Sequence, residues 1–138
     1  MAYWLVKSEP DKYSWDDLVR DGQTAWDGVR NHSAAINLRA MKLGDRAFFY
    51  HSNMGKEIVG IVEIVREHYL DPKDASGRFP AVDVAPVEAL KAPVTLAAIK
   101  ADAALACIEV VRQSRLSVVP IRDAEWTRIM AMSYAERQ

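Results

Sequence analysis

The chain has 138 residues, half of them hydrophobic and about a quarter charged, with a formal net charge of -1. This length predicts one domain, residues 1–138, that buries about two-thirds of its unfolded surface. The near-neutral charge argues against a protein that holds nucleic acid mainly through phosphates. No apolar run is long enough to span a membrane, and one cysteine, Cys107, cannot form an internal disulfide. We therefore expect a soluble, cytoplasmic protein.

Charge is unevenly distributed along the chain. The first 25 residues carry three Lys or Arg against five Asp or Glu, whereas Trp26–Lys56 carries five against two, a local excess of +3. A local basic surface and an ordinary solvated surface both fit this pattern.

The N-terminal part predicts a strand, a short helix, a turn and a second helix. Aromatic and branched residues at 3–7 predict the strand. The first helix is predicted from a capping box of Ser14 and Asp17, with Gly22 at its end. Its buried stripe is expected to be Trp15, Leu18 and Val19. Trp26 is expected in a glycine turn, before a helix over 32–41 that places Ile36, Ala40 and Leu43 on one side.

The remaining sequence predicts antiparallel strands interleaved with short helices. Strands are expected at 47–52, 57–65, 81–86 and 116–120, with a hairpin turn at 53–56 and a polar loop at 71–77. Gly60 marks a bulge or a close backbone approach within a long strand. A short helix begins at Thr95, and Asp123 caps a last helix whose Trp126, Ile129 and Met130 point inward. Cys107, among aliphatic residues, is expected in the core. Long, bent strands with short helices predict an α+β, barrel-like fold.

Three stretches, residues 3–10, 26–31 and 112–117, predict one binding pocket. Each places donors, acceptors and charges beside aromatic or apolar residues, at a strand end or in a turn. That mixture suits a flat ring that needs an aromatic face and a few placed polar groups. Trp26 could stack on a base or anchor the core, while Trp4, within a strand, is expected in the core. Lys7, Ser8 and Glu9 could read a ring edge, or form a salt bridge and a turn at Pro10.

The other candidate residues have local explanations as well. Asn31 could cap a helix or, beside Arg30, read a ring or a phosphate. His51, Ser52 and Asn53 close a strand, where the histidine could donate to a ligand or be satisfied at a rim. Arg112, Gln113, Ser114 and Arg115 suit phosphate contact and edge reading, or a solvated loop.

No pattern of catalytic or metal-binding residues has comparable density. Ser8 with Glu9 or His51 lacks the signature of an activated nucleophile. His32, His51, His68 and Cys107 show no ligand spacing. The sequence therefore predicts no catalytic residue, no metal and no cofactor.

Taken together, six ordered motifs resemble the EVE domain family, a member of the PUA-like superfamily. They cover essentially the whole chain and are Tyr3–Pro10, Trp26–Asn31, Ala40–Asp45, Phe48–Asn53, Val82–Val84 and Arg112–Val118. The resemblance implies a curved or closed β-barrel with flanking helices. It also implies a reader of modified nucleic-acid bases, usually modified cytosines, that holds a flipped or unpaired base.

The resemblance further implies that Lys7–Glu9, Trp26, Arg30–Asn31, His51–Asn53 and Gln113–Arg115 converge on one pocket. One segment departs from the family pattern, because eukaryotic relatives carry a longer stretch before the Val82–Val84 strand, usually with a tryptophan nearby. Here Arg78–Ala81 replaces it, and Phe79 is the candidate for the missing stacking face.

The function predicted from the sequence is therefore non-enzymatic binding of a modified base, in a single strand or flipped from a duplex. Two alternatives stay open. The same pocket could sense a free modified nucleobase or a similar small molecule, which the net charge of -1 favours slightly. An enzyme acting on modified nucleotides would need an activated nucleophile or a metal site. Protein partners are not predicted.

Overall fold

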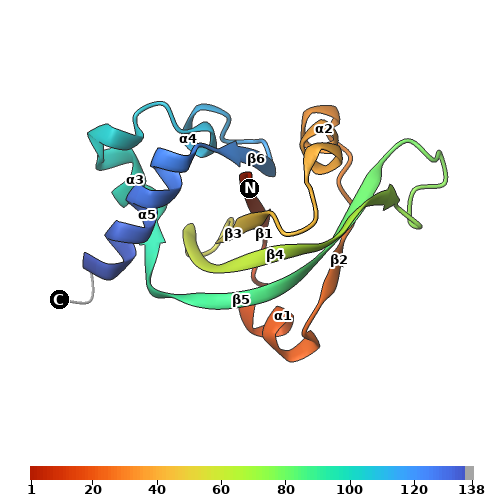
Figure 1. Cartoon of the computed structure of the whole chain (residues 1–138), viewed down its shortest axis with the longest axis horizontal. Coiled ribbons are helices and arrows are strands. Elements are labelled where there is room, and N and C mark those ends of the chain that lie inside the picture. The colour runs from red at the N-terminus through yellow and green to blue at the C-terminus, as the bar shows by residue number, and fades with distance from the viewer. Residues whose placement is uncertain (136–138) are drawn as a thin grey trace.

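The computed structural model describes residues 1–135, which form one curved, mixed sheet of six strands surrounded by short helices (Figure 1). The strands are β1 (Tyr3–Ser8), β2 (Thr24–Trp26), β3 (Arg46–His51), β4 (Glu57–Leu70), β5 (Pro80–Thr95) and β6 (Val118–Ile121). The helices are α1 (Trp15–Asp21), α2 (His32–Ala40), α3 (Leu96–Ala101), α4 (Glu109–Arg112) and α5 (Asp123–Ala135), with a 3-10 turn, η1, at Ala103–Leu105. This α+β architecture confirms the predicted fold class.

The sheet is curved but open. Its strand order is β2-β5-β4-β3-β1-β6, and β1 runs parallel to β3 while all other neighbours are antiparallel. Of the two forms expected, curved or closed, the closed barrel is therefore wrong: within residues 1–135, β2 and β6 are free edges. Both edge strands are short, and β6 contains Pro120, which has no N–H to donate to a further strand.

The curvature comes from the long β4–β5 hairpin, which sweeps across the molecule in Figure 1. Both strands extend well beyond the predicted 57–65 and 81–86, and their pairing shifts register at four places. Each shift adds twist and bends the strand. One shift lies between Ile58 and Gly60, and a Cβ atom built on Gly60 would lie 2.4 Å from the Trp15 ring. Gly60 therefore provides both a bulge and a close approach for α1.

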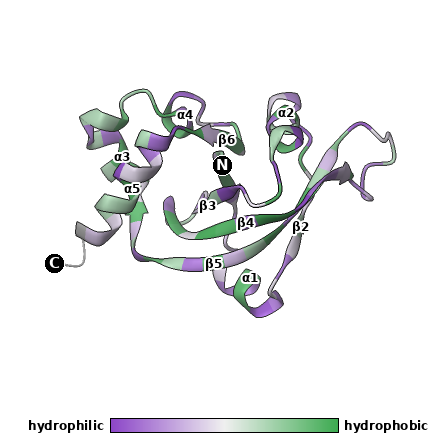
Figure 2. Ribbon diagram, in the orientation of Figure 1, coloured by the Kyte–Doolittle hydropathy of each residue, from purple (hydrophilic) through white to green (hydrophobic). Residues whose placement is uncertain are grey.

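The core lies between the sheet and its helices, and hydrophobic residues dominate β4 (Figure 2). Phe48 and Phe49 of β3 are fully buried. Trp126 of α5 stacks on Phe48 with ring centroids 3.9 Å apart, and on Tyr3 at 4.2 Å. With Ile129 also buried and Met130 partly so, the predicted inward face of this helix is confirmed, although Asp123 is its first residue rather than its cap.

The N-terminal half begins as predicted. Trp4 is buried, and its indole N–H donates to the buried Asp45 at 3.1 Å. Ser14 and Asp17 form the capping box of α1, and Gly22 ends the helix with a φ of 77°. Val19, however, is 54% exposed, so its predicted burial is wrong. A helix of two turns presents one narrow inner face, and Leu18 takes it.

The predicted inner face of α2 is also wrong. Asn31 caps this helix, one of the two roles that the sequence left open, and accepts from the Ala34 N–H. However, Ile36 is 63% and Leu43 65% exposed, and Ala40 is exposed as well. The buried side consists of Ala34, Ala35 and Leu38. Two adjacent alanines allow the helix backbone to lie close to the sheet, which the larger side of the helix would prevent.

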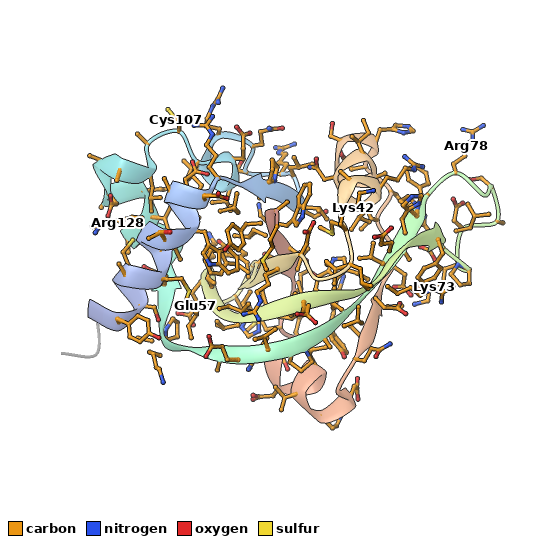
Figure 3. All side chains as sticks on the ribbon, viewed as in Figure 1. Lys42, Glu57, Lys73, Arg78, Cys107 and Arg128 are labelled. Carbon is orange, nitrogen blue, oxygen red and sulfur yellow. The ribbon has the colours of Figure 1, made fainter. Side chains whose placement is uncertain are left out.

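Two features of the C-terminal half also differ from prediction. Cys107 is exposed and points away from the body of the molecule (Figure 3). The turn after η1 directs its neighbours Leu105 and Ile108 inward, and they are fully buried. The last strand runs two residues later at its start than the predicted 116–120, whereas the helix after Thr95 is capped by that residue as predicted. No helix of residues 1–135 is long and apolar enough to cross a membrane.

Candidate functional site

A cavity of about 570 Å³ opens where β1 and β2 end. We call it the main cavity. Its walls are the end of β1 with the loop after it, β2 with the turn over 27–31, Lys73 from the β4–β5 loop, and Ser117 before β6. Its volume lies within the range of small-molecule sites.

Six of the thirteen predicted site residues line this cavity: Lys7, Ser8, Glu9, Trp26, Arg30 and Asn31. A second cavity of about 370 Å³ adjoins it and shares Asn31. We call it the arginine cavity; it is lined by Asn31, Ser33, Arg112, Gln113, Ser114, Arg115 and Leu116. The remaining four predicted residues, His51, Ser52, Asn53 and Phe79, line neither cavity.

Trp26 is the last residue of β2 rather than part of a turn. It is 8% exposed, and its ring meets Phe49 edge-on with centroids 5.6 Å apart. The indole N–H donates to none of residues 1–135 and is not enclosed. Trp26 therefore fills one of the two roles that the sequence left open, since most of its ring anchors the core; the small part that remains exposed lines the main cavity.

The end of β1 supplies a cation and a hydroxyl. Lys7 is half-buried, which lowers the pKa of its ammonium group, and Nζ donates to the Ser114 carbonyl at 2.8 Å. Ser8 donates its hydroxyl proton to the Tyr13 carbonyl at 2.5 Å. With its proton engaged, the hydroxyl of this cavity-lining serine can only accept, and the Lys7–Ser114 bond links the linings of the main cavity and the arginine cavity.

Two ion pairs lie on the wall of the main cavity. Lys12 contacts Glu9 at 2.9 Å, and Lys73 contacts Asp27 at 3.2 Å. With Lys7 and Arg30, the lining holds four cations and two carboxylates. This excess, on a chain with a net charge of -1, favours the local basic surface over the ordinary one.

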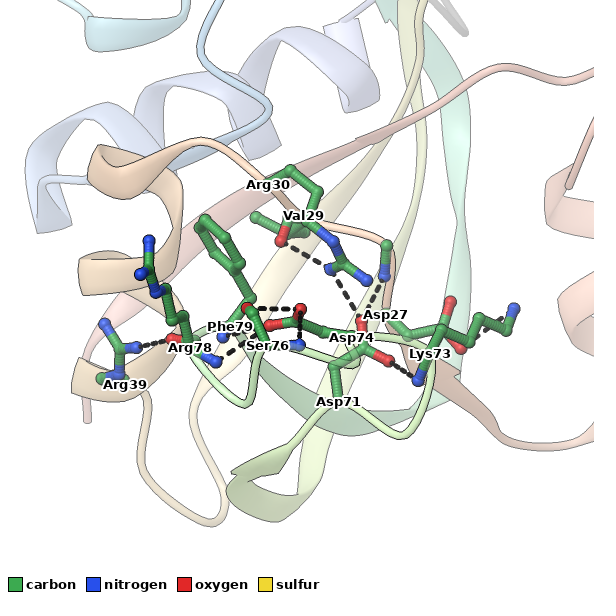
Figure 4. Close-up of polar contacts among 11 residues, drawn as sticks. Asp27, Val29, Arg30, Arg39, Asp71, Lys73, Asp74, Ser76, Arg78 and Phe79 are labelled. Atoms are coloured by element: carbon green, nitrogen blue, oxygen red, sulfur yellow. Dashed lines mark hydrogen bonds and ion pairs between the residues drawn. The ribbon is translucent and has the colours of Figure 1, made fainter.

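A buried carboxylate, Asp71, fixes the turn after β2 (Figure 4). It accepts from the Gly28 N–H at 2.8 Å, from Arg30 Nη1 at 2.9 Å and from the Lys73 N–H at 2.8 Å. Burial by itself would raise the pKa of Asp71, but these hydrogen bonds hold the pKa below its usual value. Gly28 has a φ of 76°, which permits the sharp turn.

Phe79 packs beside this network instead of forming a cavity wall. Its ring lies 5.5 Å from the Arg30 guanidinium and 5.3 Å from the His32 ring. The expected stacking face for a ligand is therefore not provided by Phe79 in the described geometry. The Arg30 guanidinium lies over the Phe79 ring and also donates to the Asp71 carboxylate. A guanidinium can bind a ring face and a carboxylate at the same time.

His51, Ser52 and Asn53 have local structural contacts. His51 Nε2 accepts the Trp15 N–H at 3.1 Å, and burial lowers the pKa of its ring. The Ser52 N–H donates to the Ser8 carbonyl at 2.9 Å, and Asn53 has a φ of 71° in the hairpin turn. The expected convergence of this strand end on the pocket is not seen: the His51 side chain contacts the start of α1, and the contacts given for Ser52 and Asn53 are those of the backbone.

Sequence reasoning missed several residues of the site, among them Lys12, Tyr13, Asp71 and Lys73. Tyr13 lines the main cavity and is less buried than Trp26. Asp71 and Lys73 lie in a polar loop more than forty residues after the turn that they contact, so no local spacing indicates them. Tyr13 stands close to Lys7–Pro10 and could have been included from its position alone. Among residues 1–135, no three His, Cys, Asp or Glu side chains are grouped so that they could hold a metal ion.

Fold and site together define a small binding domain, in which a curved sheet carries a polar, partly aromatic cavity at one end of its strands. The EVE domain family matches residues 2–132, and the chain belongs to that family.

Three relatives cover nearly the whole chain. Thymocyte nuclear protein 1 of Rattus norvegicus is 35% identical over 97% of this chain and 74% of its own length. An NMR structure from Rhodopseudomonas palustris is 55% identical, with a TM-score of 0.93 over 98% of this chain and 94% of that one. The human THYN1 protein, in a crystal structure with 5-methylcytosine-containing DNA, is 32% identical, with a TM-score of 0.90 over 96% of this chain and 98% of that one.

Proposed function

We propose that this EVE domain binds a modified nucleic-acid base, with modified cytosine in DNA as the first candidate, and holds it unpaired in the main cavity. The observation that carries the proposal is the meeting of two stretches distant in the chain, Lys7–Glu9 and Trp26–Asn31, around one cavity. The likeness to the human THYN1 protein, solved with 5-methylcytosine-containing DNA, supports the choice of ligand.

The cavity offers the groups that a cytosine-like ring requires. Glu9 and the Ser8 oxygen can accept from an exocyclic amine, and the Trp26 N–H can donate to a ring oxygen or nitrogen. Tyr13 and the Arg30 guanidinium offer flat faces for stacking. We therefore assign the stacking role first expected of Trp26 to Tyr13, because Trp26 is 8% exposed.

Energetics favour a base that is already unpaired. Extruding a base from a duplex costs a few kcal/mol, whereas one stacking contact contributes about 1–3 kcal/mol. One good edge contact contributes a similar amount. For a duplex, the cost of extrusion nearly cancels the gain from stacking and the edge contact. We therefore expect a single strand to bind more tightly than the same sequence in duplex form.

The first experiment measures binding to short single strands that differ in one central base: cytosine, 5-methylcytosine, 5-hydroxymethylcytosine or N6-methyladenine. The same bases are titrated as free nucleosides. Selective binding of one modified strand supports the proposal, and equal binding of all four strands contradicts it. Strand binding that weakens steeply with salt indicates phosphate contacts. A nucleoside that binds equally well, with no salt dependence, supports the alternative of a free-ligand sensor.

Two pairs of variants locate the ligand. Glu9→Gln and Asp11→Asn each remove one negative charge from the same loop, but only Glu9 lines the main cavity. Trp26→Phe and Trp126→Phe each shorten a tryptophan that is 8% exposed and packs on a β3 phenylalanine, but only Trp26 lines the main cavity. We expect base selectivity to fall for the first member of each pair and to persist in the second. Equal losses of base selectivity within each pair would show that the base does not bind in this cavity.

We propose binding rather than catalysis because the candidate nucleophile and base do not meet. The Ser8 hydroxyl donates to the Tyr13 carbonyl, and His51 Nε2 accepts the Trp15 N–H. Release of altered base or nucleoside from a modified strand incubated with the protein would contradict this. We further propose that the protein acts in the cytoplasm, a reducing compartment in which the exposed Cys107 stays a free thiol.

A further inference from the structure

The arginine cavity differs in chemistry from the main cavity. Its lining contains two arginines, amide groups and serine hydroxyls, and no carboxylate. Phosphate oxygens only accept hydrogen bonds and carry negative charge, and arginine is the side chain best matched to them. The main cavity mixes donors with acceptors, as an uncharged ring requires, whereas this second cavity is suited to an anion.

The carboxylate paired with this lining is already engaged by two of its residues. Glu109 pairs with Arg112 at 3.3 Å and also accepts a short hydrogen bond from the Gln113 amide. Arg115 is exposed and forms no ion pair with any of residues 1–135. Arg112 is therefore paired only at the surface, where an ion pair contributes little. Arg115 is available to a ligand.

The two cavities adjoin each other. Asn31 lines both of them, and the Lys7 ammonium in the main cavity donates to the Ser114 carbonyl in the arginine cavity. Along the chain, Leu116 lines the second cavity and its neighbour Ser117 lines the first. When one base of a strand occupies the main cavity, the neighbouring backbone of that strand can therefore reach the arginine cavity.

We propose that the arginine cavity binds a backbone phosphate next to the base held in the main cavity, with Arg115 and Arg112 as its ligands. This inference rests on the proposed function and extends it. The domain then recognises a base as part of a strand, because a free nucleoside has nothing to place in the second cavity. Lys7, held between the cavities, positions Ser114 at their boundary.

The test separates phosphate contact from base recognition. Arg115→Gln, Arg112→Gln and the double variant are compared with Arg122→Gln, which removes the same charge beyond the far end of β6. Each protein is titrated with a single strand carrying a central 5-methylcytosine, with its unmodified counterpart, and with 5-methyl-2′-deoxycytidine. The titrations are repeated at several salt concentrations, and thermal unfolding checks that each variant is folded.

We expect each arginine-cavity variant to bind both strands about three- to tenfold more weakly. The slope of the logarithm of the binding constant against the logarithm of salt concentration, the salt slope, should fall in magnitude by roughly 0.7 for each phosphate that the variant no longer binds. Nucleoside affinity and the ratio between modified and unmodified strands should stay unchanged. Arg122→Gln should leave the salt slope as in the wild type.

Three outcomes overturn the inference. If Arg115→Gln and Arg112→Gln bind the strands with the same affinity and salt dependence as Arg122→Gln, the phosphates contact other residues. Base selectivity that persists in that case leaves the proposed function intact. Variants that lose the nucleoside as much as the strand would show that the arginines act through the main cavity. A wild type without base selectivity, whose salt slope still depends on these arginines, would refute the proposed function and leave a phosphate site.

Discussion

Asp71→Asn is the sharpest single test of how the site is held, because it changes one atom at the centre of the network in Figure 4. The carboxylate accepts three hydrogen bonds, two at Oδ2 from Gly28 and Arg30 and one at Oδ1 from the Lys73 N–H. The asparagine amide has one oxygen and one NH₂ group. In either orientation, therefore, its NH₂ group faces at least one of the three N–H donors that now contact Asp71. The Asp71 side chain is fully buried, so water does not replace the missing bond.

The expected destabilisation follows from those hydrogen bonds. One buried donor left without an acceptor costs about 1–3 kcal/mol. The weakened pair with Arg30, whose side chain is 40% exposed, adds up to about 1 kcal/mol. We therefore expect Asp71→Asn to lower the free energy of unfolding by about 1–4 kcal/mol. Asp27→Asn, which breaks the exposed pair with Lys73 in the same site, should cost less than about 1 kcal/mol.

Urea unfolding at several pH values measures both the size and the origin of this effect. The pKa of Asp71 in the folded protein lies below its unfolded value of about 3.9. Its stabilisation is therefore present above that pH and is lost as the pH falls through the folded pKa. The difference between wild type and Asp71→Asn should shrink below about pH 4. A destabilisation under about 1 kcal/mol at pH 7, or a difference unchanged between pH 7 and pH 3, would refute this reasoning.

Three further predictions address other parts of the fold. Gly28→Ala adds a Cβ that meets no atom within 4 Å, so its cost of about 1–2 kcal/mol comes from the positive φ alone, and a stabilised variant would contradict it. Ser133→Ala removes a buried hydroxyl that accepts from the Ala92 N–H and donates to the Ala92 carbonyl, and unfolding should become easier by about 1–3 kcal/mol. The stability of His51→Gln should fall less than that of the wild type as the pH drops below about 6.5, because burial lowers the folded pKa of this histidine and the unfolded chain binds the proton more readily; identical pH profiles would contradict the lowered pKa.

Local rules were enough for most elements of the fold. The capping box at Ser14 and Asp17, the Asn31 cap and the glycine at position 22 are decided by groups within four residues of one another. Sequence alone can therefore predict them. Gly60 also signalled its role correctly, although the partner that requires it, Trp15, lies forty-five residues earlier.

The failures have one physical cause, which is that tertiary packing chose between faces that the sequence leaves equivalent. In α2, large apolar residues at 36 and 43 suggested an inner face, yet the sheet accepted the small residues Ala34 and Ala35. Cys107 became exposed because the turn beside it faces Leu105 and Ile108 inward. Hydrophobicity marks candidates for burial, whereas shape decides which of them fit.

The sequence by itself determined the fold class, the family motifs and the residues at the ends of β1 and β2 that face one cavity. Only the tertiary structure decided that most of the Trp26 ring anchors the core, that Phe79 supports Arg30, and that Asp71 fixes the turn. These outcomes depend on contacts between residues distant in the chain. Such contacts exist only after the curved sheet has formed, so no local pattern in the sequence records them.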